Sequence, residues 1–129
     1  DGVHLGQSDM DPKEARKILG PEKIIGVTAK TVEQAKAAES ASADYLGSGA
    51  IFATGTKLDA KPLPKEAFTA ICKSVSIPVV AIGGITADNV EYLKDTPMAG
   101  VAVVGGIFDT DDIESETKKL FDLVVSYRK

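Results

Sequence analysis

The sequence predicts an α/β fold built on a parallel sheet, and three observations support this prediction. Five short apolar runs recur along the chain, and none alternates cleanly between apolar and polar residues, which is typical of strands buried on both faces. Helix-like segments with recognisable start signals separate the runs. Pairs of glycines follow the last two runs, at the positions where active sites of parallel α/β folds collect.

The predicted strands are short and rich in Val, Ile, Leu and Gly. They span residues 2–6, 24–27, 45–49, 79–82 and 101–104. The resulting βαβαβαβαβα order is compatible with a doubly wound sheet or with a (β/α)8 barrel. No change in composition marks a linker, so residues 1–129 are predicted to belong to a single domain.

The predicted helices carry their own start and stop signals. Asp11, Pro12 and Glu14 form an N-cap, a first-turn proline and a capping-box acid, and Gly20 is placed to end that helix. Residues 31–34 repeat the capping-box pattern before an Ala-rich helix that extends to residue 39. Further helices are predicted at about 64–75, 86–93 and 111–127; the last is acidic at its start and basic toward its end, as suits the helix dipole.

The length of the chain decides between a closed and an incomplete barrel. A closed eight-stranded barrel typically needs about 200 residues or more, whereas this chain has 129 and begins directly on a predicted strand. We therefore expect an incomplete parallel (β/α)8 TIM barrel, in which residues 1–129 supply the carboxy-terminal five β/α units of the domain. The amino-terminal units are expected upstream of this segment or on another chain.

Composition and charge exclude several classes of partner. A net charge of -4 and a pI near 5.0 give no basic footprint for nucleic acid. No run approaches the roughly 18 apolar residues of a membrane span. Cys72 is the single cysteine, which excludes an internal disulfide and fits a reducing compartment. We expect a protein of the cytoplasm or of an organelle, with Cys72 as a core residue.

Two glycine pairs predict a phosphate site. Gly83 and Gly84 follow the fourth predicted strand and lead into a helix, and Gly105 and Gly106 follow the fifth. Glycine allows a ligand to approach the backbone closely, and the first amides of a helix attract anions. Barrels often bind phosphate in the loops after their last two strands. The alternative is that both pairs only make tight turns.

Polar residues after the third predicted strand offer more phosphate ligands. Thr54 and Thr56 bring hydroxyls, Gly55 frees the backbone, and Lys57 adds a point charge suited to phosphate. The alternative is an ordinary solvated loop. Because the loop follows a strand of the parallel sheet, we favour the functional interpretation.

The first two predicted strands contribute three further candidates. Asp9 could ligate Mg²⁺, which usually takes one or two carboxylates together with substrate phosphate oxygens. Thr28 ends the second strand and is either a phosphate ligand or a turn residue. His4, the only histidine, lies among apolar neighbours, which favours a structural histidine over a catalytic one.

Six segments, in order and spacing, match one known family over nearly the whole chain. They are GVHLGQSD (2–9), IGVT (25–28), ADYLGSG (43–49), TGTK (54–57), AIGGIT (81–86) and GVAVV (100–104). Together they resemble the thiamin phosphate synthase family. The Gly-Gly-Ile segment is shared by several phosphate-binding barrels, whereas the first segment combined with Thr-x-Thr-Lys is specific.

The resemblance implies a (β/α)8-barrel transferase of thiamin biosynthesis that uses Mg²⁺. Its small-molecule substrates are a hydroxymethylpyrimidine pyrophosphate and a thiazole phosphate; the thiazole nitrogen attacks a cation-like pyrimidine, and pyrophosphate leaves. By resemblance, Asp9 matches a Mg²⁺ ligand, Thr28 a Ser or Thr that contacts the pyrophosphate, and Lys57 the lysine that neutralises it. The residues that match the thiazole phosphate cradle are Thr54, Thr56, Gly84, Val104 and Gly105.

The sequence also departs from the family's pattern. Ala53 replaces a common proline, Gly105 stands where Ser is frequent, and residues 58–64 lack a glycine often found after the lysine. The family's second metal-binding Asp and its pyrimidine-binding residues would lie upstream of Asp1. We therefore expect the isolated 129-residue chain to be inactive, and to act as a homo-oligomer or with a complementing amino-terminal segment.

Two other functions are compatible with the same barrel. Thiazole tautomerase-like relatives and non-catalytic regulators tend to lose the Thr-x-Thr-Lys loop, which is present here. A phosphate-metabolite-binding module would bind thiazole phosphate without forming product. A doubly wound nucleotide binder is less favoured, because no Gly-x-Gly-x-x-Gly turn follows the first predicted strand.

Overall fold

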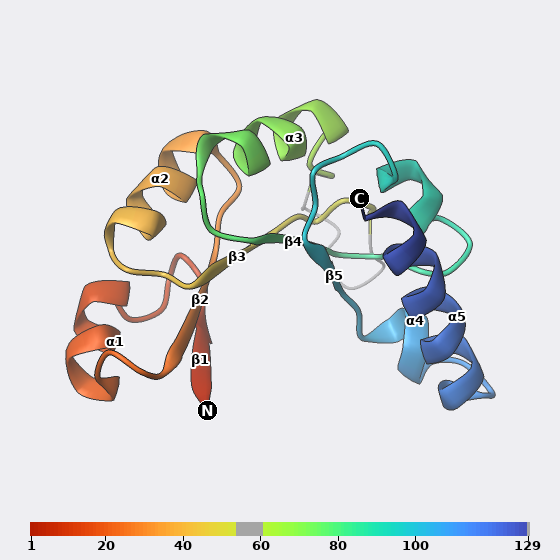
Figure 1. The fold of residues 1–129 in the computed structure, drawn as a ribbon, viewed down its shortest axis with the longest axis horizontal. Helices are drawn as coiled ribbons and strands as arrows, with labels where there is room; N and C mark the ends of the chain where they lie inside the picture. The colour runs from red at the N-terminus through yellow and green to blue at the C-terminus, as the bar shows by residue number, and fades with distance from the viewer. Residues whose placement is uncertain (54–60, 129) are drawn as a thin grey trace.

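The computed structural model describes residues 1–53 and 61–128 and contains a parallel sheet of five strands (Figure 1). The strands are β1 (Gly2–Leu5), β2 (Ile24–Thr28), β3 (Tyr45–Ser48), β4 (Val79–Ile82) and β5 (Gly100–Ala102). They pair in the order β1-β2-β3-β4-β5. A doubly wound sheet would reverse its order at a switch point, so the sequential order confirms the prediction of a barrel segment.

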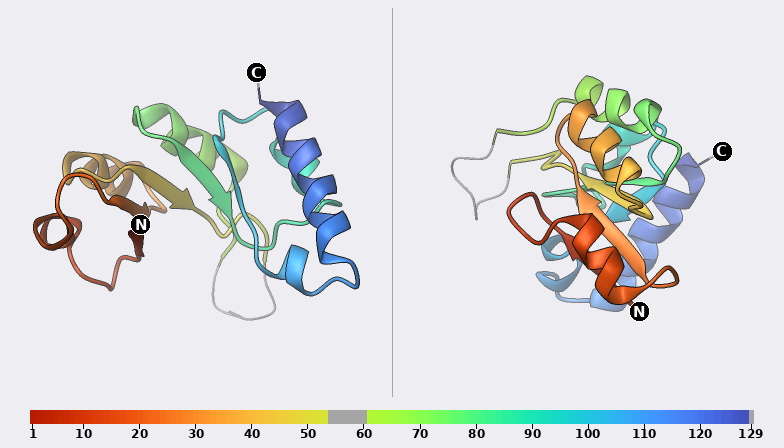
Figure 2. Two further views of the ribbon diagram at one scale, coloured as in Figure 1. Left: turned by 60° about the horizontal axis from the view of Figure 1, so that its bottom comes forward. Right: turned by 90° about the vertical axis from the view of Figure 1, so that its left-hand side faces the viewer.

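The helices follow the strands one by one. They are α1 (Pro12–Leu19), α2 (Val32–Ser40), α3 (Lys65–Ser74), the 3-10 helix η1 (Val90–Leu93), α4 (Gly105–Phe108) and α5 (Ile113–Tyr127). Figures 1 and 2 show α1, α2, α3 and α5 along the convex side of the curved sheet, as in the outer ring of a barrel. No helix of the described residues is long and apolar enough to cross a membrane.

The predicted helix caps form in the structure. The Asp11 carboxylate accepts from the Lys13 amide at 2.7 Å, and the Thr31 hydroxyl accepts from the Gln34 amide at 3.1 Å. Gln34 in turn accepts from the Lys30 amide at 2.8 Å. These bonds satisfy amides that have no partner within the helices, which is why α1 and α2 begin where the sequence predicts.

Two segments differ from the prediction. Residues 86–93 form a turn and the short η1 instead of a full helix. There, the Asn89 side chain accepts from the Thr86 amide at 2.8 Å, and the Thr86 hydroxyl accepts from the Asp88 amide at 3.2 Å. These are capping-box bonds, so the predicted start signal forms, but the segment after it continues as the 3-10 helix η1 instead of an α-helix. At the last strand, β5 ends at Ala102, and Gly105 begins the unpredicted helix α4.

The two faces of the sheet carry different side chains because residues alternate along each strand. Ile25, Val27, Leu46, Val79 and Ala81 point toward the helices and are buried. The alternate residues face the concave side. Those that line its cavity are His4, Tyr45, Gly47, Val80, Ile82 and Ala102.

The helix layer completes the core. Phe68 and Ile71 of α3 are almost completely buried, and burial of such side chains stabilises the fold by about 1.5–3 kcal/mol each. Cys72 is half-buried on the same helix and packs against this core, as predicted. Its burial raises the pKa of the thiol to about 11, so the side chain acts as a packing group.

An ion pair between Arg16 and Asp44 ties α1 to the amino ends of β2 and β3. The Arg16 guanidinium lies 2.8 Å from the Asp44 carboxylate, which also accepts from the Ile25 amide at 2.8 Å. The amide of Ile25 and then the guanidinium of Arg16 hold the pKa of Asp44 below its usual value. Arg16 also donates to the backbone carbonyls of Gly20, Lys23 and Ser42.

We predict that Asp44→Asn lowers the free energy of unfolding at pH 7 by about 1 kcal/mol, a modest value because the carboxylate is half-exposed. The lowered pKa means that the carboxylate stabilises the fold above its usual pKa and that this contribution is lost as the pH falls through the folded-state pKa. Urea titrations at several pH values should therefore show the difference shrinking in acid. Asp122→Asn, in an exposed pair on α5, is the matched control and should have little effect. A difference independent of pH would contradict this assignment.

Candidate functional site

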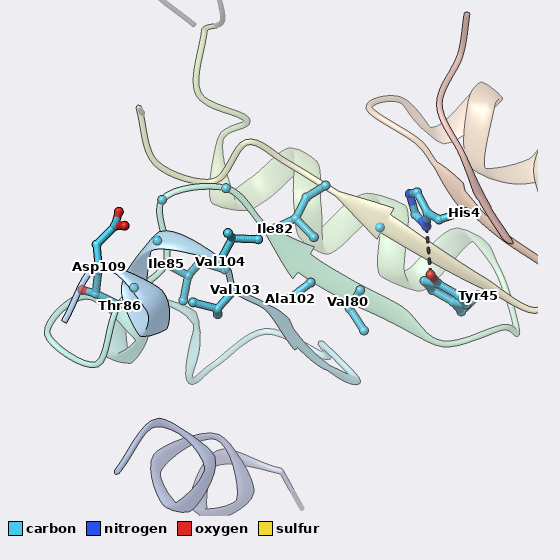
Figure 3. A pocket seen from close by; sticks show the side chains of 15 residues that line it. His4, Tyr45, Val80, Ile82, Ile85, Thr86, Ala102, Val103, Val104 and Asp109 are labelled. Carbon is cyan, nitrogen blue, oxygen red and sulfur yellow. Dashed lines mark hydrogen bonds between the residues drawn. The ribbon is translucent and has the colours of Figure 1, made fainter. Parts of the chain in front are cut away.

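A cavity of about 840 Å³ opens on the concave face and reaches the carboxyl ends of β4 and β5 (Figure 3). His4 and Tyr45 lie toward one end of it, and Thr86 and Asp109 toward the other. Its middle is lined by apolar residues of β4 and β5, including Val80. Ligand sites in parallel α/β folds lie at the carboxyl ends of the strands, which makes this cavity the candidate site.

The glycine turn after β4 is shaped by the chain that leaves β3. Gly83 and Gly84 have φ angles of 98° and 67°, which side-chain-bearing residues rarely adopt. A Cβ atom on Gly84 would lie 2.9 Å from the Cβ of Phe52. The Phe52 amide donates to the Gly83 carbonyl at 3.1 Å. The close approach therefore requires glycine, and both glycines line the cavity.

The loop after β5 faces the same cavity. Val104, Gly105 and Gly106 line it, and Val104 is 75% exposed. Gly105 is the first residue of α4, and the first amides of a helix have no acceptor within it. The structure thus brings Gly84, Val104 and Gly105, three of the residues predicted to bind phosphate, to one cavity.

Thr28 does not line the cavity itself but is hydrogen-bonded to His4, which does. The His4 Nε2 atom lies 2.9 Å from the Thr28 hydroxyl, and its Nδ1 atom lies 2.9 Å from the Tyr45 hydroxyl. Both ring nitrogens are hydrogen-bonded, although His4 lines the cavity instead of lying in an apolar core. The sequence reasoning missed Tyr45. Strand register is the signal that could have identified this residue, because Tyr45 and Gly47 lie on the same, concave face of β3.

Asp9 lies in a different hollow, beside α1 and α2. One carboxylate oxygen, Oδ2, accepts from the Gly6 amide at 2.7 Å, so Oδ1 is the oxygen better placed to ligate a cation. Residues 1–53 and 61–128 contain no group of three or more acidic, His or Cys residues arranged to hold a metal ion. The Asp9 carboxylate could therefore hold Mg²⁺ only if phosphate oxygens of a bound ligand supplied further ligands to the ion.

Thr54, Thr56 and Lys57 lie outside the described residues. The chain on either side of this loop is fixed at the carboxyl ends of β3 and β4: the Phe52 amide donates to Gly83, and the Leu63 amide donates to the Ala50 carbonyl at 2.6 Å. The roles of these three residues therefore remain a prediction; Phe52, which precedes them, is hydrogen-bonded to the cavity-lining Gly83.

An acidic side chain also lines the cavity. The Asp109 carboxylate approaches Gly105 so closely that a Cβ atom on Gly105 would lie 2.9 Å from Oδ2. Its negative charge opposes an anion at that point. This contact does not itself require glycine at 105, because the end of the flexible Asp109 side chain could move aside.

Comparison with protein families gives one match. A family model described as thiamine monophosphate synthase covers residues 1–107. The chain is 49% identical over 126 residues to a thiamine-phosphate synthase of Ruminiclostridium cellulolyticum, covering 98% of this chain and 60% of the relative. It is 50% identical over 127 residues to thiamine-phosphate synthase 2 of Streptococcus pneumoniae serotype 4, covering 95% of this chain and 60% of the relative.

Solved structures give the same result. The thiamine phosphate pyrophosphorylase from Pyrococcus furiosus superposes with a TM-score of 0.89 at 39% identity, covering 98% of this chain and 60% of that one. A 3-hexulose-6-phosphate synthase superposes with a TM-score of 0.70 at 14% identity, a likeness of fold alone, covering 96% of this chain and 62% of that one. The chain spans about three fifths of the length of the curated relatives it matches.

We predict that Asp109→Asn tightens the binding of inorganic phosphate to the complete protein. Removing one charge about 4 Å from an anion is worth about 1 kcal/mol in water, or about fivefold in affinity. Isothermal titration calorimetry at low and high salt would measure the change, which should shrink as salt rises. Asp95→Asn, an exposed residue near the amino end of β5, makes the same change in net charge and should leave the affinity unaltered. Equal effects of both substitutions would show that phosphate does not bind beside Asp109.

Proposed function

The chain belongs to the thiamine monophosphate synthase family, and from this premise we propose that its complete protein is a thiamine-phosphate synthase. The proposed reaction joins a hydroxymethylpyrimidine pyrophosphate to a thiazole phosphate. The carbon–oxygen bond to the pyrophosphate breaks, a carbon–nitrogen bond to the thiazole forms, and pyrophosphate leaves. The observation that carries the proposal is the convergence of the two glycine loops, after β4 and β5, on one cavity.

The thiazole phosphate is proposed to bind at these two loops. The backbone at Gly84, Val104 and Gly105 would donate its amides, and the absence of side chains at the glycines lets a phosphate approach. Thr54 and Thr56 would add their hydroxyls from the neighbouring loop. The first amides of α4 support this assignment, because they need an acceptor outside the helix.

The departing pyrophosphate is proposed to lie near the ends of β1, β2 and β3. Negative charge grows on it as the carbon–oxygen bond breaks, and donors placed there lower the barrier. Thr28 would donate its hydroxyl and Lys57 its ammonium group to the pyrophosphate oxygens. The nucleophile is the thiazole nitrogen, so these residues act by binding, orienting and neutralising charge.

Asp9 is proposed to hold Mg²⁺ through Oδ1, with phosphate oxygens as further ligands. When bound, Mg²⁺ supplies charge neutralisation to the pyrophosphate. The Gly6 amide bond to Oδ2 fixes the carboxylate, so the side chain is oriented before a cation arrives.

Further β/α units of the complete protein are proposed to close the barrel. β1 and β5 are the edge strands of the sheet and have a neighbour on one side only in the described residues. Beside them, large apolar side chains are exposed: Ile18 at 69% and Ile24 at 52% near β1, and Phe121 at 65% and Val125 at 49% on α5. Exposed apolar groups of this size mark surfaces that pack against other structure.

We predict that Lys57→Ala in the complete protein lowers the rate of pyrophosphate release by about 10²–10³-fold, the loss typical of removing one transition-state donor. The KM for thiazole phosphate should change much less, because Lys57 contacts the other substrate. Lys36→Ala, an exposed residue of α2, is the matched control and should retain the wild-type rate.

Three outcomes of that assay separate the alternatives. Normal turnover by Lys57→Ala would contradict the role of the lysine. Tight binding of thiazole phosphate by the wild-type protein without any product would favour a phosphate-metabolite-binding module. Thiazole isomerisation without pyrophosphate release would favour a tautomerase-like relative.

A further inference from the structure

Three side chains from three neighbouring strands form a continuous hydrogen-bonded chain on the concave face. Tyr45 of β3 bonds to His4 of β1, and His4 bonds to Thr28 of β2, each at 2.9 Å. The His4 and Tyr45 rings lie 5.5 Å apart between centroids (Figure 3). Only Thr28 has a role in the proposed reaction, so the other two members need an explanation of their own.

The glycines of the sheet make this chain of hydrogen bonds possible. In the strand register, His4 and Tyr45 both pair with Gly26, one from each side. A Cβ atom on Gly26 would overlap the Tyr45 ring, so the two rings can meet across β2 only because this residue is glycine. Beneath His4, a Cβ atom on Gly47 would lie 3.2 Å from the imidazole Cε1 atom. Both rings therefore pack directly over backbone that carries no side chain.

The direction of the two bonds decides what Thr28 can do. A neutral imidazole has one donor and one acceptor nitrogen. If Nδ1 carries the proton, the Thr28 hydroxyl must donate to Nε2, and its proton is no longer available. If Nε2 carries the proton, Tyr45 donates to Nδ1, Nε2 donates to Thr28, and the Thr28 proton can go to a third group. Phosphate oxygens at neutral pH mostly accept, so only the second arrangement serves an anion.

We propose that His4 and Tyr45 are positioning residues that keep Thr28 as a hydrogen-bond donor toward a phosphate oxygen bound near the carboxyl ends of β1, β2 and β3. The phenol hydroxyl of Tyr45 is a stronger acid than the hydroxyl of Thr28, which favours donation by Tyr45 and hence the Nε2–H tautomer of His4. The identity of the anion as a pyrophosphate rests on the proposed function, whereas the tautomer and its dependence on Tyr45 do not.

The tautomer can be measured directly by ¹⁵N NMR on the complete protein labelled at histidine. The signals of His4 are identified by their absence from the His4→Gln variant. We expect a protonated Nε2 and an acceptor Nδ1, with Tyr45→Phe shifting the ring toward the other tautomer. Tyr127→Phe removes a hydroxyl from α5 and should leave the signals unchanged. A protonated Nδ1 in the wild-type protein, or a tautomer insensitive to Tyr45→Phe, would overturn the proposal.

A double-mutant cycle with inorganic pyrophosphate as the probe tests the consequence for binding. Thr28→Val should weaken pyrophosphate binding about tenfold or more, the value of one hydrogen bond to a charged group. Tyr45→Phe should weaken it by a smaller factor in the wild-type background and by none in the Thr28→Val background. Factors that simply multiply, or no effect of Thr28→Val, would overturn the proposal.

The two proposals fail in different ways. If the wild-type protein forms no thiamine phosphate but the tautomer and the coupling are as expected, the proposed function is wrong and the positioning role stands. If the protein turns over normally while the two substitutions act independently, the positioning role is wrong and the proposed function stands.

Discussion

The alternation of side chains across the parallel sheet is the constraint on which the rest of this structure depends. Ile25 and Val27 of β2 point to the helices and are buried, while Gly26, between them, faces the concave side. A strand can therefore supply the core with one set of residues and the cavity with the other. On the concave side, glycine at 26 and 47 lets neighbouring strands project larger groups over the backbone. The alternation of side chains along the strands therefore produces both the core and the lining of the cavity.

The second organising contact is the one between the ends of β3 and β4. The chain leaving β3 lies against Gly83 and Gly84 and is hydrogen-bonded to that turn. The same contact fixes the glycine turn at the cavity and holds Ile51 and Phe52, which shortly precede Thr54 in the sequence, against the end of β4. From the sequence, Gly83 and Gly84 could either make a tight turn or leave the backbone open to a ligand. The structure is compatible with both, because the glycines that allow the close packing also leave their backbone without side chains.

Much of the fold could be predicted from the sequence because its signals are local. The continuous apolar runs and the capping residues Asp11 and Thr31 locate strands and helices within one or two residues. The 3-10 form of residues 90–93 could not be predicted, because the capping bonds of Thr86 and Asn89 are of the same kind that begin an α-helix. The contact of His4 with Tyr45 depends on strand register, which is a tertiary property. The orientation of Asp9 toward Gly6 is likewise set by a turn that composition does not specify.

The central claim is that the turns after β4 and β5 hold a phosphate group at the carboxyl ends of the strands. A crystal structure of the complete protein soaked with thiazole phosphate tests it most directly. We expect the phosphate within about 3 Å of backbone amides in the turns at Gly84 and Gly105. A phosphate bound at the opposite edge of the sheet, near Arg16, with both turns left empty, would contradict it.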